Sequence, residues 1–82
     1  MLFRSHPDLA IRLNNLAGLY QDTGSYAEAE PLYERAIAIL DKALPPGHPY
    51  RTRVRENYAH LLDQLGRYAE AAELRVPAQA IR

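Results

Sequence analysis

Tyr26-Ala27-Glu28-Ala29 returns as Tyr68-Ala69-Glu70-Ala71, 42 residues further along the chain, and this repetition decides how the sequence is interpreted. The dipeptide His6-Pro7 returns at the same distance as His48-Pro49. Self-similarity at a fixed period of this length is typical of proteins in which one supersecondary unit stacks on the next. The sequence therefore predicts a stack of two such units.

The alignment at this offset holds over most of the first unit. Between residues 6 and 40, 14 of the 35 aligned pairs are identical. We divide the chain into a lead-in at residues 1–5, a first repeat at residues 6–47 and a degenerate second repeat at residues 48–82. Pro77 lies where the last helix should continue, and proline also disfavours helical geometry in the residue before it. We therefore expect the second repeat to be broken near residues 74–77.

Each repeat is predicted to fold as two antiparallel helices, because apolar residues recur at intervals of three and four in each half. The expected fold class is all-α, with two helix-turn-helix repeats stacked on each other. The four helices are expected over about residues 7–22, from Ser25 to Pro45, over about residues 49–65, and from Tyr68 to Val76.

Local signals mark the ends of these helices. Gly24 and Gly66 can take the left-handed conformation that stops the first and third helices. Ser25 with Glu28 forms the pattern of a capping box, in which each side chain bonds a free backbone N–H at the start of the second helix. Pro31 lies inside that helix, where a missing N–H predicts a slight bend.

The side chains predicted to face the core lie on one side of each helix. In chain order they are Leu9, Leu13, Leu16, Ala17, Tyr20, Ala29, Leu32, Tyr33, Ala36, Ile37, Leu40, Val54, Tyr58, Leu61, Leu62, Leu65, Ala71, Ala72 and Leu74. The small residues Ala17, Ala29 and Ala36 would let the paired helices approach closely.

The composition fits one small globular domain. The 82 residues are 48% hydrophobic and 24% charged, ten Lys and Arg balance ten Asp and Glu, and Cys is absent. Balanced charge gives no global attraction to nucleic acid or to an anionic membrane. The absence of Cys excludes disulfides, thiolate catalysis and Cys-based zinc sites. We expect neither a signal peptide nor a membrane span, and a cytoplasmic location.

The side of the first helix of each repeat that faces away from the core is polar. It carries Asn14, Asn15 and Gln21 in the first repeat, and Arg53, Glu56, Asn57 and His60 in the second. An Asn side chain both donates to a peptide carbonyl and accepts from a peptide N–H, so amides suit an extended peptide whatever its sequence. These residues are the candidate binding site. The alternative is that they form only a solvated surface.

Residues of the first repeat carry a family resemblance. Leu13-Asn14-Asn15-Leu16-Ala17, followed by Tyr20, Gly24, Tyr26, Ala29, Tyr33 and Ala36, resembles the tetratricopeptide repeat. The 42-residue period, the His-Pro start and the run Ala-Glu-Ala-Glu-Pro-Leu-Tyr at residues 27–33 are similar to the kinesin-light-chain type of that repeat. The second repeat departs from the pattern at Arg55, Leu62 and Arg75.

This resemblance implies a short right-handed solenoid of helix pairs. Its first helices would line a concave groove that binds peptides or partner proteins. On that implication, Asn15 and Asn57 are the leading contacts in the groove.

The sequence contains no glycine-rich phosphate loop and no recognisable catalytic motif, so we expect no enzymatic activity, cofactor or bound metal. His60 with Glu56 and Asp63 could form a carboxylate-oriented imidazole, but the sequence places no further ligand beside them. The three arginines between residues 51 and 55 favour a solvated helix start over phosphate or nucleic-acid binding.

Two functions remain open. The leading hypothesis is a protein-protein interaction module that binds a peptide or partner protein through the polar face. The alternative is a self-assembly unit, because an array of two repeats leaves apolar ends that another copy can cover. In that case, the acidic first repeat and the basic second repeat would orient the copies. A closed two-fold homodimer is favoured over an open chain, since closed symmetry dominates among soluble oligomers.

Overall fold

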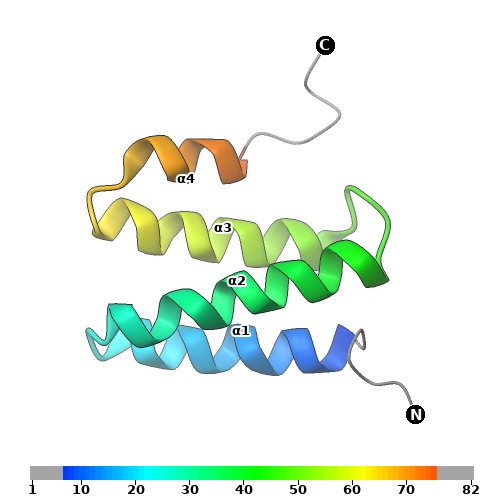
Figure 1. Ribbon diagram of the computed structural model, residues 1–82, viewed down its shortest axis with the longest axis horizontal. Helices are drawn as coiled ribbons and strands as arrows, with labels where there is room; N and C mark the ends of the chain where they lie inside the picture. The colour runs from blue at the N-terminus through cyan, green and yellow to red at the C-terminus, as the bar shows by residue number, and fades with distance from the viewer. Residues whose placement is uncertain (1–6, 76–82) are drawn as a thin grey trace.

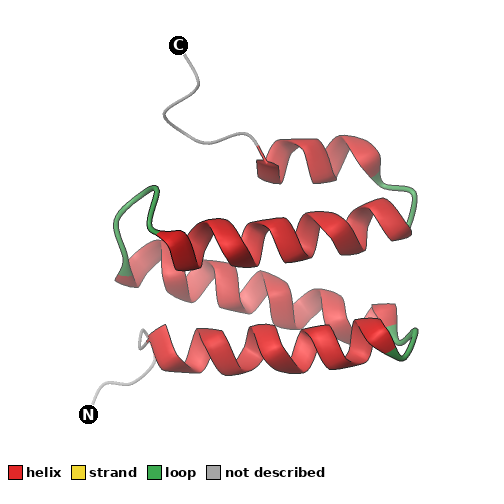
Figure 2. Ribbon diagram, turned by 180° about the vertical axis from the view of Figure 1, so that it is seen from behind, coloured by secondary structure: helices red, strands yellow, loops and turns green. Residues whose placement is uncertain are grey.

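The computed structural model describes residues 7–75 of the 82-residue chain, and this part consists of α-helices joined by turns, without a strand. The helices are α1 (Pro7–Asp22), α2 (Tyr26–Ala43), α3 (Pro49–Gln64) and α4 (Tyr68–Arg75). Both ends of α3 lie 42 residues after those of α1, and α4 begins 42 residues after α2. The predicted all-α fold with two helix-turn-helix units is confirmed (Figure 1, Figure 2).

The helices lie side by side in chain order and alternate in direction, so each unit is an antiparallel hairpin (Figure 1). α2 packs against both α1 and α3, α4 packs against α3, and α1 also touches α3. The second hairpin therefore stacks on the first mainly through α2 and α3. This arrangement brings α1 and α3, the two helices with predicted binding residues, close to each other.

The same glycine-based turn ends the first helix of each hairpin. Gly24 and Gly66 have φ angles of 82° and 81°, in the left-handed region that glycine enters without steric cost. The following residues close the turn with matching bonds, from Ser25 N to Tyr20 O and from Arg67 N to Leu62 O, both 2.8 Å long. The glycine stops predicted from the sequence are confirmed.

The helix starts differ from each other. Ser25 stands at the N-cap of α2, but its side chain makes no capping hydrogen bond, so the predicted capping box is wrong. The ψ angle of Ser25 is 64°, outside the extended region from which an N-cap side chain reaches the first free N–H groups. His48 caps α3 instead, since its Nδ1 accepts from Tyr50 N at 3.1 Å and Pro49 follows at the first helical position.

Most of the predicted core is buried, and alanines occupy the helix-helix contacts. Ala17, Ala29 and Ala36 are fully buried, as is Leu40. Four predicted core residues are exposed instead: Leu16, Tyr20, Leu65 and Ala72. Leu16, Tyr20 and Ala72 have core positions on their own helices, and Leu65 directly follows α3, but no neighbouring helix in the described part of the chain buries them. The spacing of apolar residues along one helix does not show whether another helix packs on that side.

The described span of α4 ends at Arg75, which replaces the buried Tyr33 of the first hairpin in the repeat alignment. Arg75 turns to α3 and pairs with Glu56 at 3.3 Å and with Asp63 at 2.9 Å. The break predicted at residues 74–77 falls partly outside the described residues. Within them, α4 is helical as far as Arg75, so the described part shows no break before residue 76.

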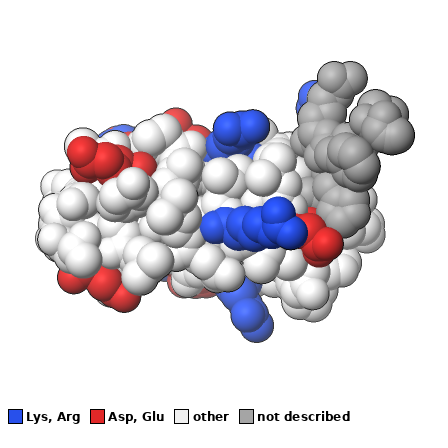
Figure 3. All heavy atoms as spheres, turned by 90° about the horizontal axis from the view of Figure 1, so that it is seen from below, with Lys and Arg blue, Asp and Glu red and all other residues white. Residues whose placement is uncertain are grey.

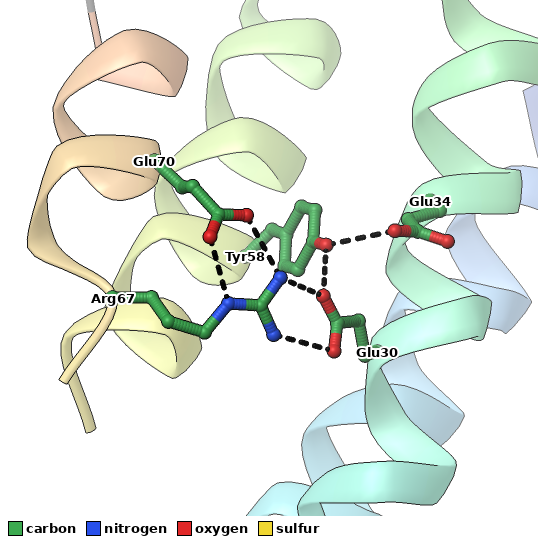
Figure 4. A network of polar contacts seen from close by, with 5 residues as sticks. All are labelled: Glu30, Glu34, Tyr58, Arg67 and Glu70. Atoms are coloured by element: carbon green, nitrogen blue, oxygen red, sulfur yellow. Dashed lines mark hydrogen bonds and ion pairs between the residues drawn. The ribbon is translucent and has the colours of Figure 1, made fainter. Parts of the chain in front are cut away.

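A polar network crosses the seam between the hairpins (Figure 4). The Tyr58 hydroxyl lies 2.6 Å from a carboxylate oxygen of Glu30 and 2.9 Å from one of Glu34. Arg67, which lies between Gly66 and the start of α4, pairs with Glu30 and Glu70, each at 2.8 Å. The Arg67 hydrogen bond, followed by that of Tyr58, holds the pKa of the Glu30 carboxyl below its ordinary value.

The buried alanines give the first prediction. Ala29→Leu would force three extra carbon atoms into a fully buried contact, and we expect it to lower the free energy of unfolding by about 1–3 kcal/mol. Ala38→Leu, at an exposed position of the same helix, should change it by less than about 0.5 kcal/mol. Urea denaturation of both variants is the measurement, and equal effects would contradict the packing described above.

The second prediction concerns Glu30. Because its pKa is lowered on folding, its carboxylate stabilises the fold above about pH 4.5, and this contribution is lost as pH falls through the lower folded-state value. The Arg67 partner is partly solvent-screened, so Glu30→Gln should cost only about 0.5–1 kcal/mol at pH 7. The difference in free energy of unfolding between the variant and the natural protein should become smaller when the pH is lowered from 7 to 3. The exposed Glu73→Gln serves as control at both pH values, and a cost independent of pH would refute the ionic role.

Candidate functional site

A groove with a volume of about 830 Å³ lies between α1, the start of α2, and α3. Its lining consists of Asn14, Asn15, Gly18, Leu19, Gln21, Asp22, Thr23, Gly24, Tyr26, Tyr33, Asn57, His60 and Gln64. Five of the seven residues predicted from the sequence are among them. Amide side chains from both hairpins dominate the surface, so the site exists only when the hairpins are stacked.

Asn14 and Asn57 join the two hairpins across the floor of the groove. Asn57 Nδ2 donates to Asn14 Oδ1 at 3.0 Å. The expectation that Asn14 stands on an open face is wrong, because α3 covers that side of α1 and leaves Asn14 only 9% exposed. The bond leaves the Asn14 amide hydrogens and the Asn57 carbonyl oxygen with further hydrogen-bonding capacity.

Gln21 is the centre of a second amide contact. Its Oε1 accepts from the Tyr33 hydroxyl at 2.7 Å, while its Nε2 donates to Gln64 Oε1 and to His60 Nδ1, the latter at 3.2 Å. Gln21 was also expected on an open face, and this too is wrong, since it is 9% exposed. All four side chains belong to the groove wall, and three different helices supply them.

This contact selects the tautomer of a neutral His60 ring, and it uses the proton of the Tyr33 hydroxyl. Gln21 donates to Nδ1 of His60, so a neutral imidazole carries its hydrogen on Nε2, where it is a donor. Burial, reinforced by the Asp22 carboxylate, raises the pKa of the Tyr33 hydroxyl. Tyr33 thus keeps the proton that it donates to Gln21.

Asn15 and Leu19 are the accessible parts of the α1 wall. Asn15 is exposed and makes no side-chain hydrogen bond within residues 7–75. Leu19 is 63% exposed and adds an apolar surface beside the amides. Asp22 supplies a negative charge at the same end of the groove. On this wall a ligand would therefore find the amide of Asn15 for hydrogen bonds, the side chain of Leu19 for an apolar contact and the carboxylate of Asp22.

Two predicted site residues do not line the groove. Arg53 is exposed on α3, and Glu56 is engaged by Arg75 of α4. Asp63 also pairs with Arg75, and His60 is held by Gln21, so the imidazole and the two carboxylates of this helix face are directed to different partners. Among residues 7–75 no three His, Asp or Glu side chains are grouped as a metal site.

The sequence did not identify several groove residues that come from outside the two first helices. Tyr33 was assigned to the core, and its ring is indeed buried, but its hydroxyl reaches the groove floor. Tyr26 and Thr23 lie near the turn after α1. The sequence did contain a signal for Tyr33. A tyrosine predicted to be buried needs a polar partner for its hydroxyl, and Gln21 on α1 is such a partner.

The third prediction tests the Gln21–Tyr33 bond. Gln21→Leu leaves the buried Tyr33 hydroxyl without an acceptor, which should lower the free energy of unfolding by about 1–3 kcal/mol. Adding Tyr33→Phe to that variant removes the unpaired group, and much of the loss should be recovered. The four proteins of this cycle can be compared by urea denaturation. Strictly additive losses would mean that the bond contributes nothing.

The chain matches one protein-family model, described as the tetratricopeptide repeat, over residues 8–74. The match spans both hairpins and every residue that lines the groove. A comparison with curated proteins gave no match. Among the described helices none has the length and apolar character needed to cross a membrane. The chain belongs to the tetratricopeptide-repeat family.

Proposed function

We propose that this member of the tetratricopeptide-repeat family is a non-enzymatic module that binds an extended peptide, or an extended segment of a partner protein, in the groove between α1 and α3. Repeats of this family generally mediate protein-protein interactions. The single observation that carries the proposal is the amide-lined groove, to which Asn14, Asn15, Gln21 and Asn57 all contribute.

The internal hydrogen bonds of the groove support this use. Asn57 and Gln21 are held in place by Asn14 and by Tyr33, so their remaining polar atoms are oriented before a ligand arrives. Preorganised groups lose less entropy on binding than mobile ones do. Asn15 keeps its whole hydrogen-bonding capacity for the ligand, and the Nε2 hydrogen of His60 adds a donor on the opposite wall.

The finer features expected from the sequence form part of the proposal. They are the kinesin-light-chain subtype, a right-handed superhelix, a cytoplasmic location, and a partner that is neither nucleic acid nor membrane. Arg53 and Glu56 contribute only if the partner extends along α3 beyond the groove, since neither lines it.

A second candidate function is self-association through the ends of the stack. The observation that favours it is a set of large apolar side chains on α1. Leu16 is 41% exposed and Tyr20 36%, and neither of them lines the groove. Burying exposed apolar side chains of this kind is energetically favourable, and another copy of the chain can bury them by packing against this surface.

The fourth prediction tests the groove with peptides selected by display from a random library against the natural protein. Asn15→Ala should raise the dissociation constant of a selected peptide about 2- to 12-fold, equivalent to the loss of about 0.5–1.5 kcal/mol from one hydrogen-bonding side chain. Fluorescence anisotropy with the labelled peptide is the measurement. Folding should be unaffected, because Asn15 is exposed and unbonded within the described chain.

The exposed Lys42→Ala, on α2 and outside the groove, is the control and should bind like the natural protein. Equal affinity of all three proteins would place the peptide elsewhere and refute the groove as its site.

A further inference from the structure

The groove has a charged residue at one end only. Asp22 is the last residue of α1, and when His60 is neutral it is the one residue with a formal charge among those that line the groove. The Asp22 side chain is exposed, and it forms no ion pair or hydrogen bond with another residue of the described chain. Its carboxylate is therefore accessible to a ligand.

Two helices end at this place. α1 ends at Asp22 and α3 at Gln64, and a hydrogen bond from Gln21 to Gln64 joins their last turns. The C-terminal end of a helix carries a partial negative charge, which Lys or Arg in the last turn offsets. α2 and α4 have such residues, Lys42 and Arg75, whereas the last turns of α1 and α3 have none. We call the region formed by these two last turns the acidic end of the groove.

The basic side chains of α1 and α3 are remote from the acidic end. Arg12 on α1 and Arg55, the last arginine of α3, stand ten and nine residues before the ends of their helices, about 13–15 Å along the axis. Arg67, which follows α3, is held by the carboxylates of Glu30 and Glu70. In Figure 3, which looks onto α1, acidic side chains lie near the end where α1 meets α2, and most basic side chains in view lie nearer the middle.

The negative charge of Asp22 acts inside the groove as well as at its edge. The Tyr33 hydroxyl lies on the groove floor, and its pKa is raised first by burial and then by the Asp22 carboxylate. A charge that acts on the floor also acts on a ligand that lies over it. The acidic end would therefore attract a cation and repel an anion.

Leu19 gives this end the shape of a site for a long side chain. It stands three residues before Asp22, on the same side of α1, and is 63% exposed. Lys and Arg side chains pack their methylene groups on apolar surface while the charged end stays in a polar environment. An apolar contact followed by a carboxylate fits such a side chain better than it fits a short amine.

We propose that the groove binds peptides that carry a Lys or Arg side chain, with the methylene groups of that side chain on Leu19 and its charged end at Asp22. The amides of Asn15 and Asn57 bond the backbone of the same peptide. This inference rests on the proposed peptide-binding function and names the class of peptide. Asp22 selects by charge, whereas the amides bind a backbone of any sequence.

Peptides selected by display against the natural protein are the probes, synthesised with an acetylated N-terminus so that the cation can come only from a side chain. The selected peptides should share a Lys or Arg. Asp22→Asn should raise the dissociation constant of such a peptide about 2- to 5-fold at low salt, as expected for one exposed ion pair. The increase should shrink at about 0.5 M salt, where charges are screened over a few ångströms.

A double-mutant cycle tests whether the two charges meet. Replacing the shared Lys or Arg of the peptide with Gln should weaken binding to the natural protein as Asp22→Asn does, and the two changes together should add little more. A peptide with Glu at that position should bind Asp22→Lys more tightly than it binds the natural protein. Fluorescence anisotropy measures each dissociation constant.

Two controls accompany the cycle. Glu73→Gln removes one negative charge from an exposed position of α4 outside the groove, and should bind the peptide like the natural protein. Circular dichroism should show that Asp22→Asn folds, because Asp22 is exposed and a negative charge at the C-terminal end of a helix is unfavourable.

The outcomes separate this inference from the function on which it rests. If no peptide is selected, or if Asn15→Ala leaves binding unchanged, the groove fails as the binding site and the inference fails with it. If Asn15→Ala weakens binding but Asp22→Asn does not, the groove stands and the cationic class is wrong. Selected peptides without Lys or Arg, or an equal effect of Glu73→Gln, also overturn the contact at Asp22.

Discussion

The stacking of Tyr58 on Tyr33 is the contact on which both the joint between the hairpins and the shape of the groove depend. On one side of this pair, the Tyr58 hydroxyl bonds Glu30 and Glu34, which fixes α3 against α2. On the other side, the Tyr33 hydroxyl bonds Gln21, which holds His60 and Gln64 in the groove wall. One aromatic pair thus links the seam to the binding surface.

The period of the sequence was sufficient to predict the fold, because both hairpins follow one pattern of apolar side chains and glycine stops. The direction of each side chain was less predictable. Asn14 and Gln21 were expected on an open face because the position of a residue on its own helix does not reveal a neighbouring helix. Leu16 and Tyr20 show the opposite error. Both were predicted to be buried, but they are exposed because no helix in the described part of the chain packs fully over them.

The residues that depart from the repeat pattern in the second hairpin have structural partners. Arg55 stands where the first hairpin has buried Leu13, and it pairs with Asp41 of α2 at 2.9 Å. Arg75 takes the place of Tyr33 and pairs with Glu56 and Asp63. These arginines could not be interpreted from the sequence, because their carboxylate partners lie on other helices. Partly exposed ion pairs of this kind contribute little stability each.

The distribution of buried apolar residues therefore decides how firmly each helix is held. α3 buries Val54, Leu61 and Leu62 almost completely, while α4 fully buries only Ala71 in its described span. Helices with few buried contacts open at the lowest free energy in a folded protein.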